Sequence, residues 1–169
     1  MSATGRASVA AAGLLALAAC QREERPPAAP LPLSPAAMGR ATYVLGSTRL
    51  DTLTLADGQL QAGDGRLVRL LPVMAWGDLT ADDRREAAAI VVVQTPAGDA
   101  FTELVVVQEI GGRPVQVAHQ YLGNRVAVEG LTIADRAVAV QLRSHRPTDP
   151  PCCPSERRTQ RLRVGAAGP

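Results

Sequence analysis

The chain has 169 residues and a formal net charge of +2, because 18 basic residues, all of them arginine, stand against 16 acidic residues. Since the opposite charges nearly cancel, no field of one sign favours nucleic acid or an anionic membrane as a partner. The aromatic residues are only Tyr43, Trp76, Phe101 and Tyr121. A stacking platform for bases, or a sugar cleft lined by aromatic rings, needs more of them. The composition therefore argues against a nucleic-acid-binding or sugar-binding protein.

The first 19 residues have the organisation of a bacterial lipoprotein signal peptide. Arg6 supplies the positive start, residues 9–17 form a short apolar run, and small residues lead directly to Cys20. This run is shorter than the roughly 20 residues of a transmembrane helix, and the alternative is a buried N-terminal helix. We expect cleavage before Cys20 and lipidation of this cysteine, so that lipid holds the mature chain to a membrane. By resemblance to lipoproteins of Gram-negative bacteria, Gln21 in place of an aspartate favours the outer membrane, with the domain facing the periplasm.

Residues 20–40 are expected to form a disordered tether that starts at the lipidated cysteine. Residues 21–40 contain five prolines and few large apolar side chains, so they cannot bury a core of their own. The folded domain is expected over residues 41–164, with residues 165–169 as a disordered tail. A single domain suits a chain of this length.

The domain is predicted to be mainly β, with about eight mostly antiparallel strands and little helix. Residues 53–55 precede Asp57-Gly58, a pair that favours a type I′ hairpin turn. Residues 90–93 and 104–107 are continuous β-branched or aliphatic runs, which predict strands covered on both faces. Residues 81–89 are expected to form a loop with one helical turn at most. The remaining strands are predicted from apolar stretches or from alternation at 67–73, 115–121, 126–133, 138–142 and 162–164.

One acidic segment has the spacing of a calcium-binding loop. Oxygen-bearing side chains fall at Asp78, Thr80, Asp82 and Glu86, which are the relative positions from which such a loop ligates hard cations. Asp83 stands where glycine usually permits the sharp turn, and it is expected to adopt a positive φ. Calcium is the candidate cofactor of this segment. The interpretation that we prefer is a solvated turn in which Asp78 caps local backbone amides.

The proline-rich segment 144–155 carries a pair of neighbouring cysteines. Cys152 and Cys153 are the thiols left once Cys20 is lipidated, and thiols outside the cytoplasm tend to oxidise. A disulfide between them is one expectation, although the usual Cα separation of about 4.4–6.8 Å exceeds the ~3.8 Å across a trans peptide. Such a strained bond would suit a redox role. Free thiols are a second expectation, and ligation of copper or zinc together with His145 is a third.

Motifs for catalysis are missing from the sequence. It contains no Gly-x-Ser-x-Gly elbow, no His-Glu-x-x-His and no phosphate loop with Gly-Lys. Ser144, His145 and Asp149 contain the atoms of a triad, but closeness along a loop is not the geometry that a triad requires. His119 alternates along one face with Val117 and is expected to be a half-buried sheet residue. We therefore expect that the protein is not an enzyme.

Three motifs resemble those of a family of bacterial secreted and lipoprotein domains. They are Gly-Asp-Leu at 77–79 followed by Ala-Ala-Ala at 87–89, Tyr-Leu-Gly-Asn-Arg-Val at 121–126, and Pro-Thr-Asp-Pro-Pro-Cys-Cys-Pro at 147–154. This chain has Asn124 where the family tends to have aspartate, and Asp83 where its loop tends to have glycine. The resemblance implies one folded domain and brings no activity with it.

Together these features predict a lipid-anchored lipoprotein of the cell envelope with a non-enzymatic, structural or partner-binding role. The 147–154 segment is the expected contact surface for an envelope protein partner, because rigid exposed loops carry recognition. One alternative is a redox or metal-handling protein that uses the cysteine pair. The other is a calcium-stabilised domain built on the Asp78 loop.

Overall fold

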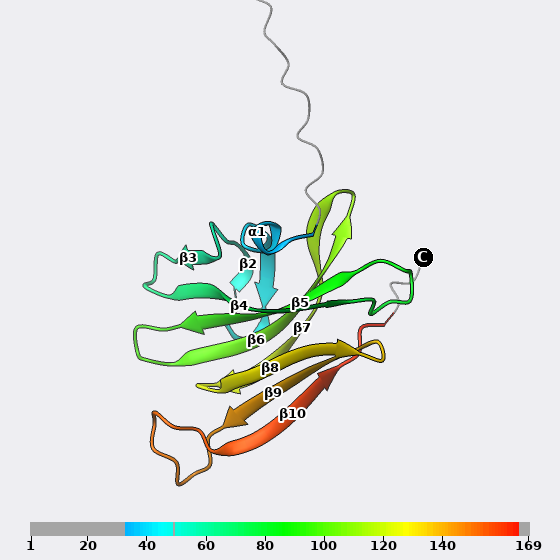
Figure 1. Cartoon of the computed structure of the whole chain (residues 1–169). Helices are drawn as coiled ribbons and strands as arrows, with labels where there is room; N and C mark the ends of the chain where they lie inside the picture. The colour runs from blue at the N-terminus through cyan, green and yellow to red at the C-terminus, as the bar shows by residue number, and fades with distance from the viewer. Residues whose placement is uncertain (1–32, 49, 166–169) are drawn as a thin grey trace, which may run out of the picture.

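The computed structural model describes residues 33–48 and 50–165 (Figure 1). The predicted signal peptide, Cys20 and the first part of the tether lie outside these residues. The described chain is mainly β, as predicted. Its elements are α1 (Pro35–Met38), β1 (Thr42–Leu45), the 3-10 helix η1 (Gly46–Thr48), β2 (Leu50–Thr54), β3 (Gln59–Gln61), β4 (Leu67–Gly77), β5 (Glu86–Gln94), β6 (Ala100–Ile110), β7 (Arg113–Asn124), β8 (Ala127–Ala134), β9 (Ala137–Ser144) and β10 (Glu156–Leu162).

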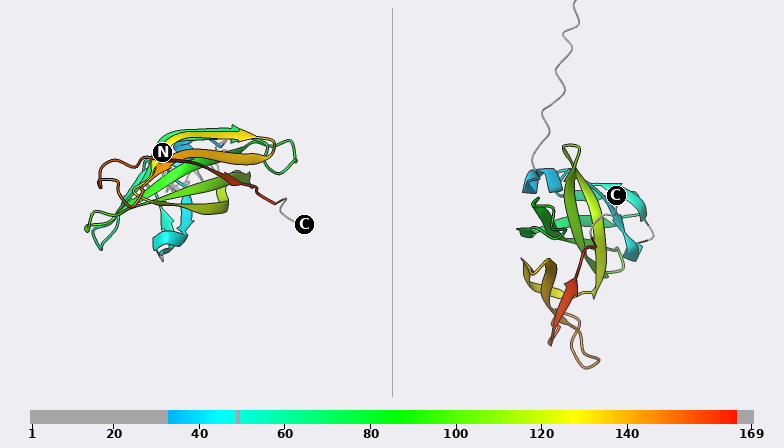
Figure 2. Two further views of the ribbon diagram at one scale, coloured as in Figure 1. Left: turned by 90° about the horizontal axis from the view of Figure 1, so that it is seen from below. Right: turned by 90° about the vertical axis from the view of Figure 1, so that its right-hand side faces the viewer.

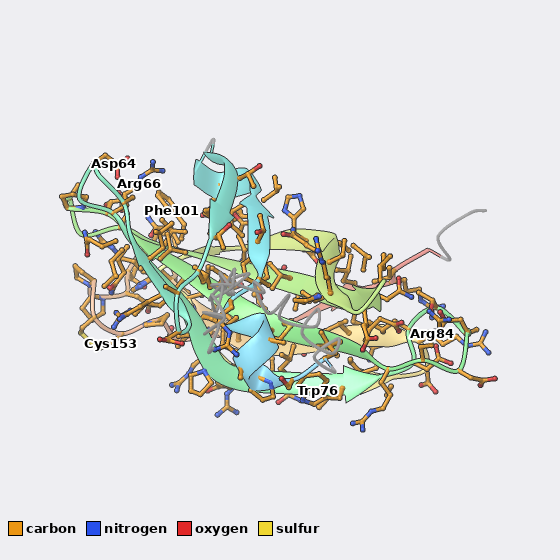
Figure 3. The ribbon with its side chains drawn as sticks, turned by 90° about the horizontal axis from the view of Figure 1, so that it is seen from above. Asp64, Arg66, Trp76, Arg84, Phe101 and Cys153 are labelled. Carbon is orange, nitrogen blue, oxygen red and sulfur yellow. A yellow bond between two sulfur atoms is a disulfide. The ribbon has the colours of Figure 1, made fainter. Side chains whose placement is uncertain are left out.

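The strands form three antiparallel sheets. Five consecutive strands make a meander in the order β3-β4-β5-β6-β7, and the other two sheets are β10-β9-β8 and β1-β2. Figures 1 and 2 show α1 and the β9–β10 connection at opposite ends of the domain. Seen from above, Asp64 and Cys153 lie on one side of the molecule, whereas Trp76 and Arg84 lie on the other (Figure 3).

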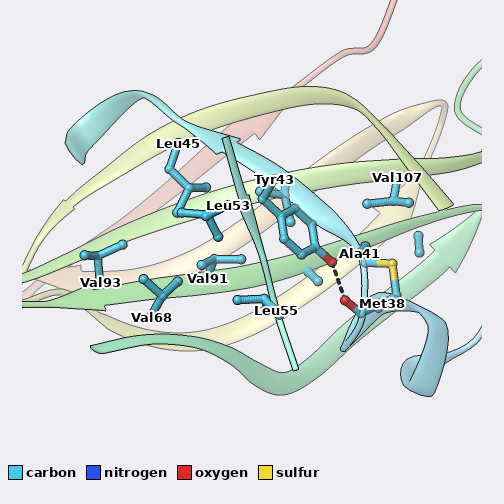
Figure 4. Packing of buried hydrophobic residues seen from close by; sticks show 13 residues of the cluster. Met38, Ala41, Tyr43, Leu45, Leu53, Leu55, Val68, Val91, Val93 and Val107 are labelled. Carbon is cyan, nitrogen blue, oxygen red and sulfur yellow. Dashed lines mark hydrogen bonds between the residues drawn. The ribbon is translucent and has the colours of Figure 1, made fainter. Parts of the chain in front are cut away.

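The five-stranded sheet is the middle layer between two hydrophobic cores. The β1–β2 core lies on one face and consists of Met38, Ala41, Tyr43, Leu45, Leu53, Leu55, Val68, Ala87, Ala89, Val91, Val93, Val105 and Val107 (Figure 4). The β8–β10 core lies on the other face and consists of Leu79, Ala88, Ile90, Leu104, Val106, Leu122, Leu131, Val138, Val140 and Leu142. Neighbouring residues of β5 and β6 therefore point into different cores. This arrangement confirms the prediction that the runs at 90–93 and 104–107 are covered on both faces.

The three-stranded sheet contacts the five-stranded sheet at both of its own edges, with β10 next to β7 and β8 next to β4. On one side, Gln160 of β10 donates its Nε2 hydrogen to the carbonyl of Leu122 on β7 at 3.1 Å. On the other side, Gly77 of β4 lies so close to β8 that an added Cβ would stand 2.6 Å from Cγ2 of Ile133. Glycine is required there by this close approach of the two strands. The β8–β10 core is consequently enclosed in a half-barrel.

The folded part begins before residue 41, so the predicted boundary between tether and domain is wrong. Ser34 caps α1 by accepting a hydrogen bond from the amide of Ala37 at 3.2 Å, and a proline follows at the first helical position. Met38 is fully buried, and its carbonyl accepts a hydrogen bond from Tyr43 Oη at 2.8 Å. Leu33 also packs against the β1–β2 core.

One predicted turn is present in the structure, whereas several predicted element boundaries differ from those observed. Asp57 and Gly58 have φ values of +50° and +82°, as a type I′ turn requires, and this turn is confirmed. Residues 81–85 form the expected loop without a helix, but the prediction that the loop extends to residue 89 is wrong, because β5 begins at Glu86. Strands β1 and β3 were not predicted, and β10 covers Glu156–Leu162 instead of the predicted 162–164.

Candidate functional site

The β9–β10 connection, residues 145–155, presents the two cysteines to solvent. Cys152 and Cys153 are exposed, and their sulfur atoms are joined in a disulfide with a Cα separation of 3.8 Å. The connection lies at the end of the domain opposite α1 (Figure 1). The structure thus joins the two thiols to each other, which was one of the three expectations. The redox role itself stays a prediction.

Asp149 holds the two ends of this loop together. Its Oδ2 accepts hydrogen bonds from the backbone amides of Arg146 and Ser155, both at 2.8 Å. Its Oδ1 accepts a third from the hydroxyl of Ser155 at 2.8 Å. The bond from the Arg146 amide, together with those from Ser155, lowers the pKa of the Asp149 carboxyl from its ordinary value. A single carboxylate therefore fixes the path of the chain on both sides of the cysteines.

Acidification is expected to loosen the loop. Because the pKa of Asp149 is lower in the folded chain than in the unfolded chain, its stabilisation is complete above about pH 4, the ordinary aspartate range, and is lost as the pH falls through the folded pKa. The amide resonances of Arg146 and Ser155, followed by NMR from neutral pH downward, should shift together below about pH 4. In Asp149→Asn both amides should already exchange faster at neutral pH and show no such titration. Unchanged amides in this variant would contradict the clamp.

The other candidate groups of this loop do not come together. Ser144 donates its hydroxyl to Glu156 Oε2 at 3.2 Å, so it is not directed at His145. The buried Nε2 of His145 has no hydrogen-bond partner among the described residues. Throughout residues 33–48 and 50–165, no group of three His, Cys, Asp or Glu side chains is placed to hold a metal ion. The atoms of the suggested triad are thus not linked, and copper or zinc binding stays a prediction.

The acidic loop between β4 and β5 uses its oxygens to fold itself. Asp78 Oδ1 accepts from the amides of Thr80 and Ala81 at 3.1 and 2.6 Å. The fully buried Glu86 accepts from the amide of Leu79 at 2.6 Å and from the Thr80 hydroxyl at 3.3 Å.

Asp82 completes this set of internal contacts. Its Oδ1 accepts from the amide of Arg84 at 3.0 Å, and its Oδ2 accepts from Gln108 Nε2 at 3.2 Å. The expected positive φ of Asp83 is confirmed at +61°. The carboxylates of Asp78, Asp82 and Glu86 thus accept from donors of this chain, and Thr80 donates its hydroxyl to Glu86. Calcium binding stays a prediction.

No family model, curated protein or solved structure matches the chain. The site must therefore be interpreted from its own geometry. Within the described residues, no helix has the length and apolar character to cross a membrane.

A buried acidic centre on β6 was missed by the sequence reasoning. Glu103 is fully buried on the side of the β1–β2 core. Its Oε2 accepts from the amide of Gly46 at 3.1 Å and lies 3.2 Å from Nδ1 of His119. Its Oε1 accepts from the amide of Ser47 at 2.7 Å and also from the hydroxyl of that residue. The one sequence signal was an acid directly before the run 104–107, which was expected to be covered on both faces.

His119 of β7 borders a shallow apolar groove next to this centre. The imidazole is 40% exposed, and the groove, of about 440 Å³, is also lined by Val44 and Val115. The predicted alternation of Val117 and His119 on one face is wrong, because a register shift places Ala118 opposite Val106 and Gln116 opposite Val107. Val117 packs against the β8–β10 core, whereas His119 contacts Glu103. Through the carboxylate of Glu103, which contacts both the Ser47 hydroxyl and the His119 imidazole, this centre connects η1, β6 and β7.

Proposed function

We propose that the protein is a lipid-anchored component of the bacterial cell envelope that acts as a non-enzymatic, partner-binding module. Its contact surface is the β9–β10 connection with the disulfide of Cys152 and Cys153. The observation that carries the proposal is the form of this loop. It is exposed, it is closed by the three hydrogen bonds to Asp149, and it lies at the end of the domain opposite α1.

The position of the loop suits a domain that is anchored through its N-terminus. Thirteen residue steps separate Cys20, the proposed lipidation site, from Leu33, so the chain between them spans at most about 45 Å. Because α1 begins at Pro35, the tether joins the domain at the end opposite the cysteine loop, which leaves the loop accessible to a partner in the periplasm. A rigid loop also loses little conformational entropy when it binds.

The lipid anchor is tested by Cys20→Ser in the producing bacterium. The variant should leave the membrane fraction and appear in the soluble periplasmic fraction, whereas the unchanged chain sediments with the membranes. Equal sedimentation of the two chains would contradict the anchor.

The contact surface is tested with a photocrosslinking residue in intact cells. We expect a discrete adduct when it replaces the exposed Thr148 of the loop, and none when it replaces the exposed Ile110 at the end of β6. Deletion of residues 152–154 should abolish the Thr148 adduct and leave the thermal unfolding of the sheet unchanged. Equal adducts from both positions would contradict a loop-specific contact. Unfolding of the deletion variant would show that the loop is structural.

A further inference from the structure

The outer face of the β10-β9-β8 sheet carries a row of arginine side chains. Leu162 packs against the β8–β10 core, so its neighbours Arg161 and Arg163 belong to the opposite, solvent side. Val138, Val140 and Leu142 of β9 are likewise core residues. The register then pairs the outward residues of the two strands as Arg143 with Arg157, Gln141 with Thr159, and Ala139 with Arg161.

This face contains a groove that is lined by both short and long side chains. A groove of about 340 Å³ is lined by Thr132, Ala137, Ala139, Thr159, Arg161 and Arg163, among others. Thr132, Ala137 and Ala139 line it with short side chains from β8 and β9, and Arg161 of β10 and Arg163 just beyond β10 line it with long ones. Asp135 and Gln141 also line the groove, and a peptide backbone can approach it over the short alanine and threonine side chains.

Two of the arginines on this face have no acidic partner among the described residues. Arg143 Nε lies 2.6 Å from Glu129 Oε1, and Arg157 Nε lies 4.0 Å from Glu129 Oε2. Arg161 and Arg163 are exposed and form no ion pair within the part of the chain that the structure describes. A ligand can therefore pair with both of them without breaking an existing contact.

We propose that this face binds an extended, acidic segment of the partner protein, with carboxylates at alternate positions. Arg161 lies in β10 and Arg163 directly follows its last residue, and two residues of extended chain correspond to about 7 Å. Asp or Glu side chains at alternate positions of an extended peptide have the same spacing. Guanidinium and carboxylate groups form paired, charge-assisted hydrogen bonds. The proposal rests on the proposed partner-binding function and adds the chemistry of the partner.

The surroundings favour a protein segment over a uniformly charged polymer. Glu129 lies on the same face and Asp135 lines the groove, so a polymer with an acid on every unit would place like charges together. A peptide can place neutral or basic residues at those points. The face is also continuous with the cysteine loop, because the pair Arg143–Arg157 is followed by Ser144–Glu156, where the loop begins. One partner segment can contact both.

The test uses the mature chain with Cys20→Ser and two fluorescent peptides, one of alternating Glu and Ser and one of alternating Gln and Ser. We expect only the Glu peptide to bind, with an affinity that falls as salt is added. Arg161→Gln with Arg163→Gln should weaken binding about tenfold, which is the effect of losing two exposed ion pairs. The matched control is Arg84→Gln with Arg85→Gln, two exposed arginines of the β4–β5 loop without an ion pair among the described residues. The control should bind as the unchanged chain does.

A second variant reverses the charge at the same two positions. Arg161→Glu with Arg163→Glu should lose the Glu peptide and gain an alternating Lys and Ser peptide. Equal binding of the Gln peptide, or an equal loss in the Arg84 and Arg85 control, would overturn the proposal. Tighter binding of dextran sulfate than of the Glu peptide would overturn the assignment to a protein segment. If crosslinking from Thr148 succeeds while the peptide does not bind, this inference fails and the proposed function stands; the reverse result removes the loop contact alone.

Discussion

Glu103→Ala is expected to lower the free energy of unfolding by about 2–4 kcal/mol, because donors that lose a buried charged acceptor are costly to leave unpaired. The carboxylate is fully buried, and it accepts from the amides of Gly46 and Ser47 while it also contacts His119. Its removal leaves these donors without an acceptor and detaches the β1 end from β6. Urea unfolding followed by circular dichroism measures the loss.

The control for this experiment lies on the same strand and the same face. Glu109 of β6 is only partly buried, and its carboxylate forms no hydrogen bond or ion pair among the described residues. Glu109→Ala should therefore change stability by less than about 0.5 kcal/mol. Glu103→Gln keeps the shape of the side chain but removes its charge. Because the amide nitrogen would face other donors, this variant should recover little of the stability that Glu103→Ala loses. A Glu103→Ala protein as stable as the Glu109→Ala protein would show that the buried carboxylate does not hold β1 in place.

Leu104→Ala is expected to cost about 2–5 kcal/mol, through lost burial and the cavity that remains. Leu104 is fully buried in the β8–β10 core, where it belongs to the same cluster as Val140 and Leu142. Strands β5 and β7 pair with β6 on its two sides, so the surrounding structure has little freedom to collapse into the cavity. Thermal unfolding by calorimetry measures the effect.

Ile110→Ala provides the matched comparison. Ile110 ends the same strand and is 50% exposed, so its truncation removes few contacts and should change stability by less than about 0.5 kcal/mol. If Leu104→Ala were as mild as Ile110→Ala, the three-stranded sheet would not be packed on β6 as described. A large loss at Leu104 alone supports the two-core arrangement.

Strong local patterns predicted most of the sheet. The continuous runs in β5 and β6 indicated strands covered on both faces, and Asp57-Gly58 identified its turn, because both features depend only on neighbouring residues. Strand β3 is three residues long and α1 only four. Segments this short do not show a detectable hydrophobic periodicity. The β7 register shift was hidden for another reason: Val117 and His119 alternate in sequence, and only pairing with β6 shows where the alternation breaks.

The candidate site was predicted in part. Exposed Cys152 and Cys153 on a proline-rich connection follow from local sequence, but the clamp by Asp149 depends on how Arg146 and Ser155 are brought together. Glu103 was missed because its donors at Gly46 and Ser47 lie more than 50 residues away along the chain. The Glu86 contacts are local, yet spacing alone does not distinguish a metal ligand from an acceptor of backbone hydrogen bonds.

The middle position of β5 has a consequence for how this protein can change in evolution. Ala87, Ala89 and Val91 share their core with β1 and β2, whereas Ala88 and Ile90 share theirs with β8 and β9. A larger side chain at one position must be compensated by a smaller one in its own core, while the adjacent position is free of that demand. Related sequences should therefore preserve two separate records of compensating substitutions, interleaved residue by residue along a single strand.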